Sequence, residues 1–279
     1  MAGTASTSRR YFALVLLAAG ALLVSGCQLT RAVSAWAQSK SHFYVCTSDA
    51  RIVCEPGSET LARAAATALP PALDAVARAQ FAPFPQPVTV YTYASRESYV
   101  AHTGQARESA GSVFLKAVHL SPKLLEQEPP RLPRILAHEL SHLHLAQGMS
   151  TLAWGRVPGW FSEGLAVYVS HGGGAENVSA ESARVAISQG KHFVPEATQS
   201  WVGPKHAASY GLDAHMYYRQ AALFVEHLHD SEPAAFERLI RSLAGGAQFD
   251  SSVRSAYAKP LDELWVGFLT ATKAWNLSN

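Results

Sequence analysis

A pair of histidines, His138 and His142, constrains this sequence more than any other feature. On a helix, side chains four residues apart lie on one face, so both imidazoles can reach a single ion. Leucine and isoleucine residues recur at helical spacing around the pair, which predicts a helix over 130–147 with Gly148 as a left-handed cap. Because zinc prefers neutral imidazole ligands, the pattern predicts a zinc site.

The residue after the first histidine, Glu139, is placed to act as a base. It projects beside the ion rather than into the ligand set, where it can take a proton from an activated water and pass it to a leaving amine. A catalytic zinc also needs a third protein ligand and an open position. The metzincin spacing is excluded, because it requires Gly at 145 and His at 148, where this chain has Leu145 and Gly148.

The third ligand is expected in the segment 158–168, where Glu163 stands among tryptophan, phenylalanine, leucine and valine. A carboxylate in such surroundings is costly to bury unless it is paired or bound to a metal. The neighbouring Gly164 removes side-chain bulk where two helices must approach each other. The alternative is that Glu163 is an exposed helix residue and that the aromatic side chains form a simple core.

The elements predicted along the chain indicate an α+β fold, in which a small sheet precedes a mainly helical half. Strands are expected at 87–93 and 112–121, and a helix at 58–80 that Pro70 and Pro71 should break or kink. A short helix is expected at 95–102 with Ser95 as its cap. Further helices are predicted at 159–170, 180–189, 213–229, 233–243 and 261–274.

The first 26 residues are typical of an export signal. Arg9 and Arg10 precede an uncharged run over 11–24, which is shorter than the about 20 residues that span a bilayer. The run ends in Val-Ser-Gly-Cys and resembles the bacterial lipobox, in which Cys27 is lipidated after cleavage. We therefore expect a lipid-anchored protein of the cell envelope that faces the periplasm, with the outer membrane favoured by Gln28. A plain signal peptide or a single membrane anchor is the alternative, and the Sec and twin-arginine export routes both stay open.

Two cysteines remain if Cys27 carries lipid, namely Cys46 and Cys54. An even pair in an oxidising compartment is a disulfide candidate, and we expect it to close a short hairpin at 42–55. The alternative is two free thiols. Residues 1–26 are thus interpreted as the signal, 27–57 as a tether and disulfide hairpin, and 58–279 as the catalytic domain.

The charge balance argues against a nucleic-acid partner. Removing the signal takes Arg9 and Arg10 from the 23 basic residues and no acidic residue, which leaves 21 basic against 21 acidic residues. A nucleic-acid binder needs a basic face to neutralise phosphates. We expect a monomer whose partners are a peptide or protein substrate and the membrane that holds its lipid.

A His-Glu-x-x-His helix followed about twenty residues later by a Trp-x-x-Glu-Gly-x-Ala helix resembles the gluzincin metallopeptidases. More narrowly, it is similar to the peptidase-MA-like family of bacterial envelope proteins. The resemblance covers roughly 88–275 and includes a Tyr-containing helix at 218–228 and a last helix bearing Trp265. It implies a zincin-like fold with Glu139 as general base and three zinc ligands, which are His138, His142 and Glu163.

The resemblance also implies a group that stabilises the tetrahedral oxyanion, since gluzincins commonly use a downstream tyrosine or histidine. Tyr218 is the matching position; Tyr217, Tyr210 and His215 are alternatives, and core packing is the alternative role of Tyr218. The implied activity is zinc-dependent hydrolysis of peptide bonds. Two other functions stay open, namely a zinc-binding envelope scaffold without turnover and a hydrolase of cell-wall peptide stems.

Two polar residues have weaker predicted roles. His144 is the second-best histidine for a metal, but it lies two residues from His142 and points to a different face of the helix. Asp213 is expected to cap a helix, with support of a ligand histidine as the alternative.

Overall fold

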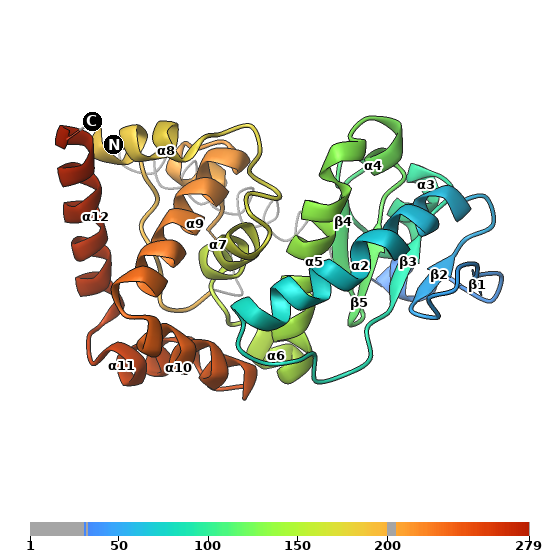
Figure 1. Cartoon of the computed structure of the whole chain (residues 1–279), viewed down its shortest axis with the longest axis horizontal. Coiled ribbons are helices and arrows are strands. Elements are labelled where there is room, and N and C mark those ends of the chain that lie inside the picture. Colours follow the sequence, from blue (N-terminus) through green and yellow to red (C-terminus); the bar gives the residue numbers. More distant parts are fainter. Residues whose placement is uncertain (1–30, 32, 200–204, 279) are drawn as a thin grey trace, which may run out of the picture.

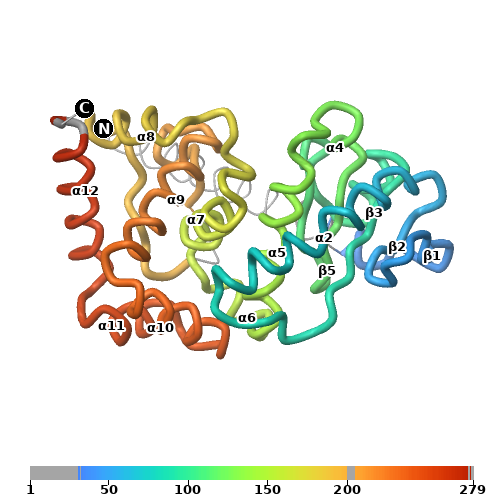
Figure 2. The backbone as a smooth tube through the Cα atoms, viewed as in Figure 1, coloured from blue at the N-terminus to red at the C-terminus, as the bar shows by residue number. Residues whose placement is uncertain are grey.

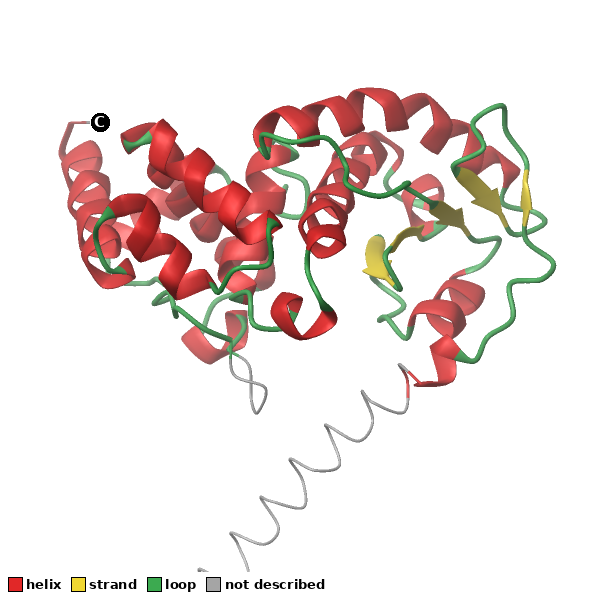
Figure 3. Cartoon of the chain, turned by 90° about the horizontal axis from the view of Figure 1, so that it is seen from below, coloured by secondary structure: helices red, strands yellow, loops and turns green. Residues whose placement is uncertain are grey.

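The structure is a computed structural model that describes residues 31, 33–199 and 205–278. The predicted signal and Cys27 lie outside these described residues. The predicted α+β class is confirmed: a small mixed sheet occupies one end of the molecule, and the C-terminal half is mainly helical (Figures 1 and 3). None of the described helices is both long and apolar enough to cross a membrane.

The sheet has five short strands in the order β1-β2-β3-β5-β4. Parallel pairing joins β2 to β3 and β3 to β5, whereas β1 and β4 pair antiparallel at the two edges. An edge strand keeps one row of backbone groups without a partner in the sheet, so β4 can pair with another chain. The strands are Tyr44–Val45 (β1), Ile52–Cys54 (β2), Val90–Thr92 (β3), Gly111–Phe114 (β4) and Ala117–Leu120 (β5).

The single strand predicted at 112–121 is wrong, because β4 and β5 form a hairpin there. The two residues between the strands, Leu115 and Lys116, both have positive φ, at 49° and 56°. Two-residue hairpin turns need this conformation, and Asn-Gly or Asp-Gly usually supplies it. Since neither residue type stands at the turn, the sequence carried no signal for it.

Helix α2 (Glu59–Ala79) passes through Pro70 and Pro71 without a break, contrary to the expected interruption. The prolines remove two backbone donors, but the buried residues Leu69, Ala72 and Val76 continue the apolar stripe across them. This stripe packs against α5 (Leu132–Gly148), which also contacts β4 and β5. Packing therefore outweighs the local cost of the prolines.

The predicted helices of the C-terminal half are confirmed within a few residues, and α7 packs mainly against α9. Figure 2 shows how the chain passes from the sheet half to the helical half through α5 and α6. The sequence missed the short helices α4 and α6 and also α11, whose serine-rich sequence resembles a loop. The bounds are α3 Arg96–Thr103, α4 Lys123–Glu126, η1 Pro129–Arg131, α6 Thr151–Trp154, α7 Gly159–Val169, α8 Ala180–Ser188, η2 Ala207–Tyr210, α9 Ala214–Ser231, α10 Pro233–Ala244, α11 Phe249–Tyr257 and α12 Leu261–Ser278.

Gly148 does not have the predicted left-handed cap conformation. It is the last residue of α5, and a β-carbon there would lie 2.1 Å from the carbonyl oxygen of Ala244. The missing side chain therefore allows α10 to approach the end of α5. Gly164 plays the same part between α7 and α9, as predicted, because a β-carbon there would lie 2.7 Å from the backbone of Ala221.

Candidate metal centre

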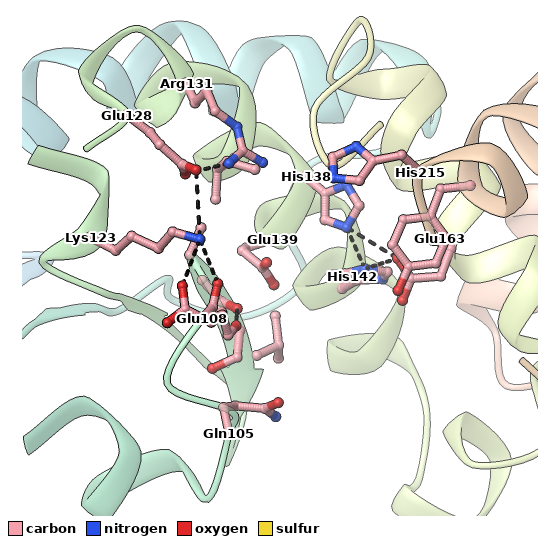
Figure 4. Close-up of a pocket in the computed structure, with 18 of the residues that line it drawn as sticks. Gln105, Glu108, Lys123, Glu128, Arg131, His138, Glu139, His142, Glu163 and His215 are labelled. Atoms are coloured by element: carbon pink, nitrogen blue, oxygen red, sulfur yellow. Dashed lines mark hydrogen bonds and ion pairs between the residues drawn. The ribbon is translucent and has the colours of Figure 1, made fainter. Parts of the chain in front are cut away.

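The two histidines of the motif project from α5 into a cleft between the sheet and the helical half (Figure 4). Both are buried, with 6% of His138 and 9% of His142 exposed. The helix forms there because Leu136, Leu140 and Leu143 pack into the core on its other side. As the spacing predicts, the two Nε2 atoms converge, and they lie 3.1 Å apart.

Glu163 reaches the same point from α7. Its Oε2 lies 3.3 Å from Nε2 of His138 and 3.6 Å from Nε2 of His142. The core on the far side of α7 holds this helix, where Trp160 packs against Phe224 and its indole nitrogen donates to the carbonyl of Glu196. The structure thus brings together the three residues predicted as ligands, and they form a possible metal-binding triad.

The donor atoms fit a small tetrahedral ion. Zinc binds nitrogen and oxygen at about 2.0–2.1 Å, which places neighbouring ligands of a tetrahedron about 3.3 Å apart. The three separations in the triad are 3.1, 3.3 and 3.6 Å. Two imidazoles and one carboxylate would leave one position of a tetrahedral ion for a water molecule, which a catalytic site requires.

A backbone carbonyl orients the first ligand. The Nδ1 of His138 donates a hydrogen bond of 2.9 Å to the carbonyl oxygen of Gly173. Because a carbonyl can only accept, the proton of the neutral imidazole is held on Nδ1 and the lone pair of Nε2 faces the other two ligands. Gly173 lies in the run of three glycines, 172–174, that follows α7.

Charges in the triad reinforce one another. Burial alone would raise the pKa of Glu163, but the positive charge and hydrogen bonds of His142 and His138 outweigh it and lower that pKa. For His138, burial alone would lower the pKa, but the hydrogen bond and charge of Glu163 raise it to about 9. Without an ion the site therefore favours a carboxylate beside a protonated histidine, and a bound metal ion would take the place of that proton.

Glu139 is buried and faces the cleft beside the triad (Figure 4). Burial raises the pKa of its carboxyl group, and the charge of Glu163 adds to this, while His138 and His142 oppose it. The side chain fits because the neighbouring strand residue is Gly111: a β-carbon there would lie 2.9 Å from Cγ and 3.1 Å from Oε1 of Glu139. A carboxylate with a raised pKa is suited to accepting and returning a proton.

The cleft has a volume of about 590 Å³ and lies along the edge strand β4. Its wall opposite the triad is charged and consists of residues of α4, η1 and the neighbouring loops, which the sequence did not single out (Figure 4). There the ammonium group of Lys123 lies 3.4 Å from Glu108 and 3.6 Å from Glu128, and Arg131 also pairs with Glu128. These contacts join α4 and η1 to the loop residues Glu108 and Glu128.

Of the four candidates for the oxyanion-stabilising group, Tyr218 and His215 line the cleft. Tyr217 and Tyr210 instead stack on each other at a separate small cavity, with ring centroids 6.1 Å apart. The negative charge of Glu163 and burial raise the pKa of Tyr218, so that its hydroxyl stays protonated. Tyr218 is therefore a hydrogen-bond donor within the cleft.

The remaining predicted residues lie away from the triad. His144 is on another face of α5, where its Nε2 donates to the carbonyl of Ala82 at 2.9 Å. Asp213 caps α9 by accepting from the backbone nitrogen of Met216. Cys46 and Cys54 are joined by a disulfide that links β2 to the end of β1, far along the sheet from β4.

No protein-family model matches the chain. No curated protein matches it either. The resemblance to gluzincin peptidases therefore stays a prediction, carried by the motifs and by the convergence of three ligands and a carboxylate in one cleft.

Proposed function

We propose that this chain is a zinc-dependent peptidase of the gluzincin kind, similar to the peptidase-MA-like envelope proteins. The convergence of His138, His142 and Glu163 to within 3.6 Å of one another, with Glu139 beside them in the same cleft, supports the proposal most strongly. Two imidazoles and one carboxylate are a ligand set typical of catalytic zinc, whereas magnesium and calcium prefer oxygen ligands.

Bound zinc would lower the pKa of a water in the open position and polarise the substrate carbonyl. Glu139 removes a proton from the attacking water, whose oxygen adds to the carbonyl carbon of the peptide bond. The same carboxyl group then returns the proton to the amide nitrogen, and the carbon–nitrogen bond breaks. Tyr218 donates a hydrogen bond to the oxygen that gains negative charge.

The edge strand favours a peptide as the substrate. Ser112 and Val113 of β4 line the cleft, and the outer edge of β4 has no partner strand among the described residues. An extended peptide can add to such an edge through backbone hydrogen bonds, which do not depend on its sequence. Lipidation at Cys27 would place this activity at the cell envelope, facing the periplasm, with peptide or protein substrates.

Zinc content tests the metal site first. The purified chain should carry about one zinc per molecule, and His142→Ala should lose most of it, because only two ligands remain. His144→Ala is the matched control, since this histidine lies two residues away on a different face of α5. Equal zinc content in the two variants would refute the ligand assignment.

Replacing Glu139 with Gln tests turnover. The amide cannot accept the proton, so hydrolysis of a mixed peptide library should fall by at least about 10²-fold while zinc content is unchanged. If the wild-type chain binds zinc but cleaves no peptide, the site belongs to a zinc-binding scaffold and the proposed peptidase activity is wrong.

A further inference from the structure

The segment between α7 and α8 packs its backbone directly on the metal triad. We call residues 172–177 the glycine loop, after its first three residues. A β-carbon at Gly174 would lie 3.0 Å from Cε1 of His138, and one at Gly173 would lie 2.7 Å from the carbonyl oxygen of Arg134. Any side chain at these positions would push the loop off α5 and withdraw the carbonyl that orients His138.

The glycine loop lies close to α5, but its own backbone does not fix its conformation, because glycine has the greatest conformational freedom of all residues. Gly172 and Gly174 adopt φ values of 102° and 86°, which side chains rarely permit. The glycine loop therefore needs restraint from outside itself if it is to hold the Gly173 carbonyl at a fixed place.

Two arginines supply that restraint from opposite sides. On the sheet side, Arg131 forms a bidentate pair with Glu176, with nitrogen–oxygen distances of 2.9 and 3.0 Å. On the helical side, Arg219 of α9 donates to the carbonyls of Ala175 and Val178 at 3.0 and 2.9 Å. The Arg131–Glu176 pair is partly buried, at 25% and 15% side-chain exposure, so solvent screens it less than an exposed pair.

We propose that Arg131 and Glu176 form a positioning pair that clamps the glycine loop onto α5 and so keeps the Gly173 carbonyl on Nδ1 of His138. Arg131 immediately precedes α5, so the pair joins the loop to the helix that carries two ligands. The pair does not touch the ion; it acts by fixing the ring orientation of one ligand, and its effect on metal binding rests on the proposed zinc site.

Glu176→Gln tests the pair, because the amide keeps the shape of the side chain but loses its charge and its bidentate acceptance. Zinc affinity, measured by competition with a chromophoric chelator, should fall about tenfold. Arg131→Lys should also lower the zinc affinity, since an ammonium group cannot form the two parallel hydrogen bonds of a bidentate pair with Glu176. The matched control is Asp49→Asn, which disrupts another bidentate pair, with Arg51, on the loop between β1 and β2.

A second measurement does not need metal. In the zinc-free protein, the Nδ1 proton of His138, identified by its loss in His138→Ala, should exchange with water faster in Glu176→Gln than in the wild type. Wild-type protein that binds no zinc would refute the proposed metal site, while the proton signal would still test the clamp. Unchanged zinc affinity and unchanged proton exchange in folded Glu176→Gln and Arg131→Lys would overturn the clamp.

Discussion

Gly111 and Glu139 lie so close together that a methyl group on the strand residue would fall 2.9 Å from Cγ of the glutamate. The first residue of the edge strand thus makes room for the proposed base. Gly111→Ala should displace the carboxylate and lower peptide turnover at least about tenfold, because proton transfer depends on geometry at the sub-ångström scale.

Zinc content of Gly111→Ala should stay at the wild-type value, since the atoms nearest to the added methyl group belong to Glu139 and Ile135 and not to the triad. Measuring peptide cleavage and zinc in the same preparation separates the two effects. A variant with full activity would mean that Glu139 does not act from its observed position.

Tyr218→Phe should lower kcat by about 10- to 100-fold with little change in KM, because the lost hydrogen bond forms mainly in the transition state. Tyr217→Phe is its control, since Tyr217 is adjacent in sequence but lies at a separate cavity. Steady-state kinetics on one peptide substrate compare the two. Equal losses in both variants would assign the effect to packing, and His215 would then be the remaining candidate in the cleft.

Gly164→Ala should destabilise the fold by about 1–3 kcal/mol, because the added methyl group would press on the backbone of Ala221 and force α7 away from α9. Gly267→Ala is the control: this helix position in α12 has open space around it, so alanine should stabilise the chain by about 0.5–1 kcal/mol. Urea unfolding of both variants measures the difference, and a Gly164→Ala variant as stable as wild type would contradict the close approach.

The chain should lose stability as the pH falls from about 6.5 toward 3, and His119 should be one cause. Burial, together with the charges of nearby Lys40 and His102, lowers the pKa of this histidine to about 3, while its hydrogen bond to the Phe114 carbonyl opposes the change. Between these pH values the unfolded chain binds a proton that the folded chain does not. The loss at pH 5 is therefore about 2 kcal/mol.

His119→Gln removes this proton uptake and should flatten the decline in stability between pH 7 and pH 5 by that amount. The glutamine can still pair with Tyr93, whose hydroxyl donates to Nδ1 of His119 at 2.6 Å in the wild type. Urea unfolding at each pH gives the slope. An unchanged slope would show that His119 does not titrate between the two states.

Sequence predicted those parts of the site that depend on local periodicity. His138 and His142 are one helical turn apart, and the apolar stripe of α5 was visible in the sequence, so their convergence followed from spacing alone. Glu163 was predicted as a ligand because it is an acidic residue within an apolar segment. The close approach of two helices at Gly164 was also predicted, because a glycine within a helix removes the side-chain bulk that would keep them apart.

The rest depends on contacts between distant residues. The Gly173 carbonyl and the Arg131–Glu176 pair join segments more than 30 residues apart, and no local pattern indicates which loop will meet which helix. The turn at Leu115 and Lys116 was missed because the sheet imposes a conformation that neither residue prefers. In α2, packing of the apolar stripe outweighed the tendency of Pro70 to interrupt a helix.

The triad takes its residues from two helices, α5 and α7, and this has a consequence for the chain without a metal ion. His142 and Glu163 are separated by 20 residues that include α6 and the start of α7, so a shared ion would close this stretch into a ring. Closing a ring restricts the unfolded chain more than the folded one, which adds to stability. If the proposed function is right, a chelator should therefore do more than stop turnover. Removal of the metal ion should loosen the contact between α5 and α7, and residues 143–162 should then become accessible to proteases.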